Sequence, residues 1–81
     1  MSDADPTVQQ MRAAIEAALP DASVEVVKNS PGHFQIKVVS PAFAGKSRVR
    51  QQQMVLSAIA DLMKGEAAPV HAIDRLDTLT A

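Results

Sequence analysis

The sequence predicts an α+β fold in which helices cover one face of a three-stranded mixed sheet, in the order α-β-β-α-α-β. Three observations support this class. Two long segments carry apolar residues at helical spacing, two segments with alternating apolar residues flank a dense turn signal, and a helical stretch precedes a third strand. The chain has 81 residues, of which 47% are hydrophobic and 21% are charged, and this suits one modest core.

The first element is a helix expected from about Pro6 to Leu19. Asp5 is a good N-cap, and Pro6 stands at the first helical position, where its missing N–H group costs nothing. One apolar stripe recurs at helical spacing and consists of Val8, Met11, Ile15, Ala18 and Leu19. Residues 1–5 precede this helix and are expected to be a flexible N-terminus.

A β-hairpin follows the first helix. Val24 and Val26 alternate with polar residues, and residues 29–32 (Asn-Ser-Pro-Gly) form a strong turn signal. In the second strand the apolar side chains expected to face the core are Phe34, Ile36 and Val38.

The second half of the chain predicts a helical crossover and a last strand. A single helical turn is expected at 42–44, and a long helix from about Ser47 to Lys64, with its buried stripe at Val49, Leu56, Ile59 and Met63 and with Val55 and Leu62 at the margins. The last strand is expected from Val70 to Leu76. Because a helical crossover joins the second and third strands, these strands should be parallel. One domain then spans residues 6–77, and residues 78–81 form a short tail.

Composition excludes several classes of function. Eight basic and nine acidic residues give a net charge of −1, so bulk charge favours neither nucleic acid nor an anionic membrane. The chain has no cysteine, which excludes disulfides, thiolate metal sites and a cysteine nucleophile. Residues 45–47 (Gly-Lys-Ser) end like a phosphate-binding loop, but Ser40 occupies the position of that motif's first glycine. An enzyme is therefore not predicted, and the absence of a signal or spanning segment predicts a cytoplasmic protein.

Two groups of residues remain as candidate sites. His33 opens the second strand and His71 opens the third, so parallel strands would place both imidazoles at the same end of the sheet. Lys46, Arg48 and Arg50 cluster at the start of the long helix, where positive charge opposes the helix dipole. Such a basic cluster is either a solvated face or a contact surface for an anion, a nucleic acid or an acidic partner.

Three fragments of the chain, in their order and spacing, resemble the BolA family. They are residues 32–35 (Gly-His-Phe-Gln), residues 40–49 (Ser-Pro-Ala-Phe-Ala-Gly-Lys-Ser-Arg-Val) and residues 70–73 (Val-His-Ala-Ile). The stretch at 47–53 is most similar to the IbaG branch, in which Gln-Gln replaces the more usual Arg-His. The resemblance covers about residues 7–80 and implies a fold similar to the class II KH domain, without the Gly-x-x-Gly loop that clamps RNA.

The resemblance also implies a function. Members of the family pair with a monothiol glutaredoxin and share a 2Fe-2S cluster with it, in iron–sulfur trafficking or iron sensing. The histidine of the family's His-Ala segment is the characteristic ligand and falls on His71. A second ligand comes from the loop between the first two strands, and the only candidate in or beside that short loop is His33, which matches the family's His-Phe position.

The absence of cysteine agrees with this expectation. A chain without thiolates holds no such cluster when alone, but it can donate imidazole nitrogen while glutaredoxin and glutathione supply sulfur. Alone, the chain is expected to be a monomer or a weak dimer without a membrane partner. The alternative is a nucleic-acid-binding regulator, because the turn near Phe43 and the helix after it resemble a helix-turn-helix. Lys46, Arg48 and Arg50 would then contact phosphates and bind weakly.

Overall fold

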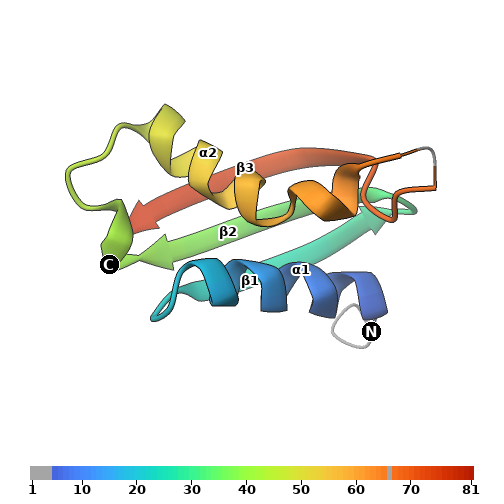
Figure 1. The fold of residues 1–81 in the computed structure, drawn as a ribbon, viewed down its shortest axis with the longest axis horizontal. Coiled ribbons are helices and arrows are strands. Elements are labelled where there is room, and N and C mark those ends of the chain that lie inside the picture. The colour runs from blue at the N-terminus through green and yellow to red at the C-terminus, as the bar shows by residue number, and fades with distance from the viewer. Residues whose placement is uncertain (1–4, 66) are drawn as a thin grey trace.

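A computed structural model of the protein describes residues 5–65 and 67–81. Its elements are α1 (Pro6–Ala18), β1 (Ser23–Ser30), β2 (His33–Ser40), the 3-10 turn η2 (Pro41–Phe43), α2 (Arg48–Ala58), the 3-10 turn η3 (Ala60–Met63) and β3 (Ala72–Thr80). Both α-helices lie on one face of the sheet (Figure 1). This is the α+β fold and the element order that the sequence predicts. Of the predicted flexible segment 1–5, only Asp5 lies within the described residues.

The three strands form one sheet in the order β1-β2-β3. β1 pairs antiparallel with β2, with Val26 opposite Ile36, and β2 pairs parallel with β3, with Ile36 opposite Leu76. The antiparallel hairpin and the parallel crossover are thus both confirmed. The central strand β2 contributes the predicted Phe34, Ile36 and Val38 to the core, each at most 2% exposed.

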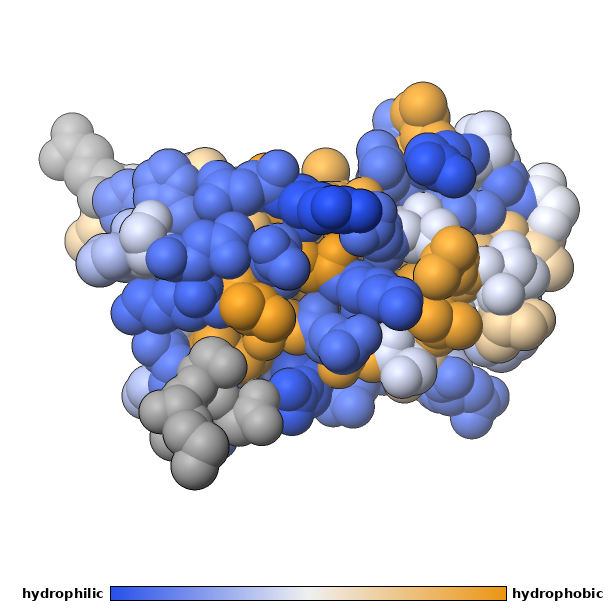
Figure 2. Space-filling view, turned by 180° about the vertical axis from the view of Figure 1, so that it is seen from behind, coloured by the Kyte–Doolittle hydropathy of each residue, from blue (hydrophilic) through white to orange (hydrophobic). Residues whose placement is uncertain are grey.

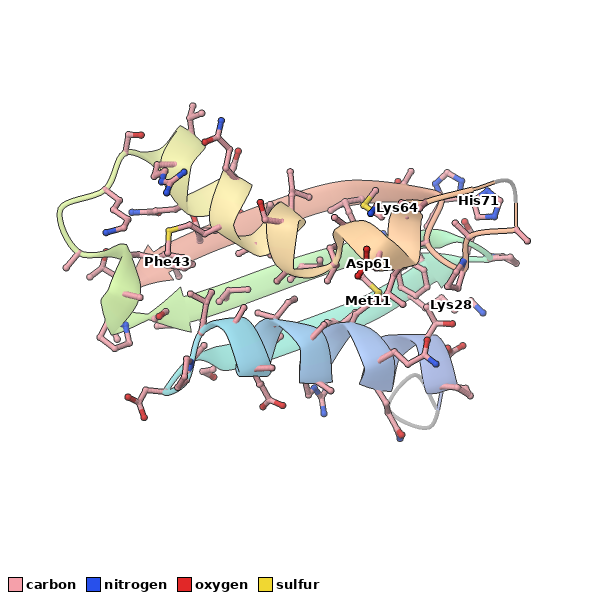
Figure 3. The ribbon with its side chains drawn as sticks, viewed as in Figure 1. Met11, Lys28, Phe43, Asp61, Lys64 and His71 are labelled. Atoms are coloured by element: carbon pink, nitrogen blue, oxygen red, sulfur yellow. The ribbon has the colours of Figure 1, made fainter. Side chains whose placement is uncertain are left out.

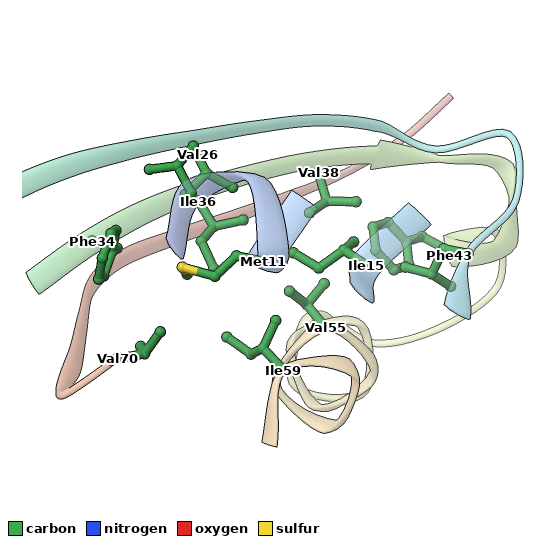
Figure 4. Close-up of a cluster of buried hydrophobic side chains, with 12 residues drawn as sticks. Met11, Ile15, Val26, Phe34, Ile36, Val38, Phe43, Val55, Ile59 and Val70 are labelled. Atoms are coloured by element: carbon green, nitrogen blue, oxygen red, sulfur yellow. The ribbon is translucent and has the colours of Figure 1, made fainter. Parts of the chain in front are cut away.

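The hydrophobic core lies between the sheet and the two helices (Figure 4). α1 contributes Met11 and Ile15, α2 contributes Val55, and the C-cap residue of α2 is Ile59; all four are fully buried. Phe43, in η2, closes the core at the end where the chain leaves β2. The core is aliphatic apart from the two phenylalanines, as the composition requires.

The opposite face of the sheet is not covered by the helices. Figure 2 views the molecule from that side and shows a mostly hydrophilic surface with separate apolar spots. A shallow hollow on the sheet is lined mainly by charged and polar side chains, which are Glu25, Gln35, Lys37, Arg75 and Asp77. The single helical layer of the predicted fold is therefore confirmed.

α1 begins and ends close to its predicted bounds. The Asp5 side chain accepts hydrogen bonds from the backbone N–H groups of Thr7 at 2.8 Å and Val8 at 3.4 Å, and Pro6 occupies the first turn. Leu19 is the C-cap rather than the last helical residue, and its side chain is buried. The predicted N-terminus of this helix is confirmed. The sequence could predict it because the cap is an interaction between neighbouring residues.

The predicted stripe of α2 is partly wrong. The helix ends at Ala58, and the chain continues as a 3-10 turn to Met63 instead of as one helix to Lys64. Val55 and Ile59 are fully buried, whereas Val49 is 64% and Leu56 38% exposed. The reason is the position of the helix: its first turn lies beyond the edge of β3, away from the sheet (Figure 1). The core therefore selects the i, i+4 pair Val55 and Ile59. Ile59 of the predicted stripe is confirmed, whereas Val55, predicted at the margin, is buried in place of Leu56.

The last strand is displaced toward the C-terminus. β3 runs over Ala72–Thr80, so it starts after the predicted Val70 and includes most of the residues predicted as a tail. Its length follows from pairing, because Val38 lies opposite Thr78 and Ser40 opposite Thr80. Thr78 is buried, and its hydroxyl donates a 2.8 Å hydrogen bond to the Gln51 side chain. Among the described residues, no helix is long and apolar enough to cross a membrane.

Candidate metal-ligand site where β2 and β3 begin

The two histidines of the chain lie at the same end of the sheet. His33 is the first residue of β2, and it pairs with Ala72, the first residue of the parallel strand β3. His71 comes just before that strand, and its backbone N–H donates a 2.8 Å hydrogen bond to the carbonyl of Gly32. Figure 3 shows His71 at this end of the ribbon. The predicted co-location of the two residues is therefore correct, although His71 precedes the strand rather than opening it.

The His71 side chain rests on Gly32. A methyl carbon built at Gly32 would lie 2.5 Å from His71 Cδ2 and 2.8 Å from Cγ. Real Cβ atoms do not approach so closely, so only glycine leaves room for this ring. Gly32 also has a φ of +79°, a backbone conformation that favours glycine. The atoms of His71 nearest to that position are Cδ2, Cγ and Cβ, so a carbon edge of the ring faces Gly32.

A carboxylate holds the other imidazole. Asp74 Oδ1 lies 3.1 Å from His33 Nδ1, and Asp74 Oδ2 accepts a 3.1 Å hydrogen bond from Asn29 Nδ2. The hydrogen bond from Asn29 and then that from His33 lower the pKa of Asp74. Asp74 is therefore ionised at neutral pH and can act toward His33 only as an acceptor.

Comparison with known proteins assigns the family. The family model for BolA-like proteins matches residues 9–81, which is almost the whole chain. The chain belongs to the BolA-like family. The comparison with curated protein sequences gives no match.

Solved structures of other proteins share this fold. The BolA domain of SufE1 from Arabidopsis thaliana has a TM-score of 0.81 at 25% identity, with 94% of this chain and 93% of that chain covered. The solution structure of yeast Fra2 has a TM-score of 0.66 at 30% identity, with 90% and 77% covered. The XC975 protein has a TM-score of 0.63 at 36% identity, with 99% and 95% covered.

Three residues of this BolA-like site were not found by sequence reasoning. They are Gly32, Asn29 and Asp74. Gly32 carried a usable signal, since glycine is the usual residue in tight turns and where another group approaches the backbone closely. The contacts of Asn29 and Asp74 with His33 could not be predicted, because they depend on the register of all three strands.

The basic cluster is separate from the histidines. Lys46, Arg48 and Arg50 lie at the start of α2, at the opposite end of the molecule from His71 (Figures 1 and 3). All three are exposed, and Ser47 caps the helix by accepting a 3.2 Å hydrogen bond from the Arg50 backbone N–H. η2 has only three residues and its Phe43 is buried, so this segment supplies one helix and not the two of a helix-turn-helix.

Proposed function

We propose that this BolA-like protein is a non-enzymatic partner of a monothiol glutaredoxin, with which it shares a 2Fe-2S cluster in iron–sulfur trafficking or iron sensing. The observation that carries this proposal is the position of His71. Its imidazole is exposed, its backbone N–H donates a hydrogen bond to the Gly32 carbonyl, and a carbon edge of its ring faces Gly32. Such a ring can present nitrogen to a partner's metal without rearrangement of the fold.

The donor set of the chain fits a shared cluster. The chain offers two imidazoles and no thiolate, and within the described ranges no three His, Asp, Glu or Cys side chains gather to hold a metal ion. A cluster shared with glutaredoxin and glutathione would take its sulfur ligands from them and imidazole from His71, with His33 as the second candidate. Mixed imidazole and thiolate ligation is known to raise the reduction potential of 2Fe-2S clusters.

Anaerobic reconstitution tests this proposal. The protein is mixed with a monothiol glutaredoxin, iron, sulfide and glutathione, and visible circular dichroism and size-exclusion mass are compared with those of glutaredoxin alone. We expect a heterodimer with an altered cluster spectrum, and we expect His71→Ala to lose that spectrum. No complex and no spectral change would overturn the proposal.

Two controls locate the ligands. Arg48→Ala/Arg50→Ala changes exposed residues at the far end of the molecule and should leave the spectrum unchanged. His33→Ala should alter the spectrum if His33 is the second ligand, and a spectrum identical to that of the wild type would assign His71 as the only ligand from this chain.

The second candidate function is nucleic-acid binding through the basic cluster. It is favoured by the exposure of Lys46, Arg48 and Arg50 at a helix N-terminus, where Asp or Glu would be the stabilising choice. It is weakened by the missing first helix of a helix-turn-helix. Binding that survives His71→Ala but is lost in Arg48→Ala/Arg50→Ala would support it.

A further inference from the structure

Two irregularities of the sheet bracket His33. Between β1 and β2 the register moves from Lys28 opposite Phe34 to Ser30 opposite His33, so Asn29 is an extra residue. Between β2 and β3 the register moves from Ile73 opposite Phe34 to Arg75 opposite Gln35, so Asp74 is an extra residue. Extra residues of this kind redirect side chains and are frequent beside functional sites.

The two extra residues meet each other next to the His33 ring. Asp74 joins them, because one of its oxygens accepts from Asn29 and the other lies against His33 Nδ1, both at 3.1 Å. The His33 and Asp74 side chains are 46% and 41% exposed, and pairs so exposed add little to stability. The pair is therefore expected to contribute little to folding, while its hydrogen bond orients the His33 ring.

We propose that Asp74 is a positioning residue that holds the proton of the neutral His33 ring on Nδ1 and presents Nε2 unprotonated to the shared cluster. An ionised carboxylate only accepts, so the nitrogen beside it must donate, and a neutral imidazole then carries its lone pair on the other nitrogen. Carboxylates commonly fix metal-binding histidines in this way. This assignment rests on the proposed function for its metal, but not for the position of the proton.

The experiment reads the proton directly in the protein without metal. Ring ¹⁵N chemical shifts of the histidines are measured by long-range ¹H–¹⁵N correlation at a pH of about 8, where imidazoles are neutral. We expect His33 in the Nδ1–H form. Asp74→Ala should return it toward the Nε2–H form that a free imidazole prefers, while the backbone spectrum of the fold is retained.

Asp77→Ala is the matched control. It removes the same charged side chain from the same strand, but its partner is Arg75 and not His33. His33 should keep the Nδ1–H form in this variant. Wild-type His33 in the Nε2–H form, or an equal change in both variants, would overturn the proposal.

A second readout separates this proposal from the proposed function. With glutaredoxin and cluster present, Asp74→Ala should retain the cluster about 10–100-fold less well than the wild type. A cluster that forms and depends on His71, but is indifferent to Asp74→Ala, would overturn the role of Asp74 and leave the proposed function intact. No cluster in the wild type, together with His33 in the Nδ1–H form, would overturn the proposed function and support the assigned proton position.

Discussion

At the scale of single residues, the position of the His71 ring depends on the lack of a side chain at Gly32. Gly32 combines a positive φ with direct contact to the His71 ring, so Gly32→Ala should add backbone strain and also displace the ring. We expect a loss of about 2–3 kcal/mol in the free energy of unfolding. We also expect changed NMR shifts at His71. Urea denaturation and ¹H–¹³C spectra of the imidazole check these expectations.

Gly45 offers the control for this substitution. It has a φ of +75°, but a methyl group there would meet nothing within 4 Å. Gly45→Ala should therefore cost about 1 kcal/mol from the backbone alone. Its His71 shifts should be those of the wild type. Equal losses in the two variants, with His71 unmoved in both, would contradict the proposed support of the ring.

The residues of the site show what a sequence reveals at this scale. His33 and His71 could be placed at one sheet end because strand order and direction follow from turn and crossover lengths. Asp74 could not be paired with His33 in advance, because alternation along β3 is interrupted at Asp74 itself. Ile73 and Leu76 both pack against the core although three positions separate them, so strict alternation fails between them. That break indicates an extra residue in this segment, but it does not say which side chain the extra residue contacts.

At the scale of the elements, α1 is tied to β1 by a charge. Asp5 caps the helix and also accepts a 3.1 Å hydrogen bond from Lys28 Nζ. The Lys28 hydrogen bond, followed by that of the Thr7 N–H, lowers the pKa of Asp5 from the ordinary value of 3.8. A lowered folded-state pKa stabilises the protein above pH 4 or so, and this stabilisation is lost as the pH falls through the folded value.

Asp5→Asn tests this dependence on pH, because asparagine still caps a helix but carries no charge. The wild type should be more stable than the variant at pH 7, and the difference should shrink as the pH falls below 3.8 and through the lowered folded-state pKa of Asp5. Urea denaturation at pH 7 and at a series of acidic pH values measures it. In a Lys28→Gln background the difference at pH 7 should be smaller, and a difference independent of pH would rule out this origin.

α2 shows where periodicity stops being informative. Its apolar residues fit two stripes, and the sequence alone favoured the one through Val49 and Leu56. The choice is made by where the helix crosses the sheet, which is a tertiary property. Local patterns sufficed for the α1 cap and the hairpin, but the face of α2 and the end of β3 were decided by partners distant in the chain.

A matched pair of substitutions measures the energetic result of that choice. Val49→Ala and Val55→Ala are the same chemical change on one helix, at 64% and 0% exposure. Val55→Ala should lower the free energy of unfolding by about 2 kcal/mol through lost burial and a small cavity. Val49→Ala should change it by less than about 0.5 kcal/mol. Chemical denaturation separates them, and similar losses would place the first turn of α2 against the core.

At the scale of the whole molecule, the two candidate chemistries lie at opposite ends. The imidazoles sit where β2 and β3 begin, and the basic cluster sits at the start of α2 (Figures 1 and 3). The aliphatic core and the sheet lie between them. A substitution at one end therefore changes no direct contact of the residues at the other end. This separation is what makes the two functional hypotheses distinguishable by substitution.

The basic cluster sets an upper limit on the salt dependence of any DNA binding. Three cations on a chain of net charge −1 can neutralise at most three phosphates, so the slope of log K against log salt for duplex DNA should be no steeper than about −2.7. Fluorescence anisotropy of a labelled duplex between about 20 and 200 mM salt measures it. Because the chain has no tryptophan or tyrosine on which bases could stack, affinity should be weak throughout. Arg48→Ala/Arg50→Ala should flatten the slope, whereas a steep slope that persists in this variant would place the contact surface elsewhere.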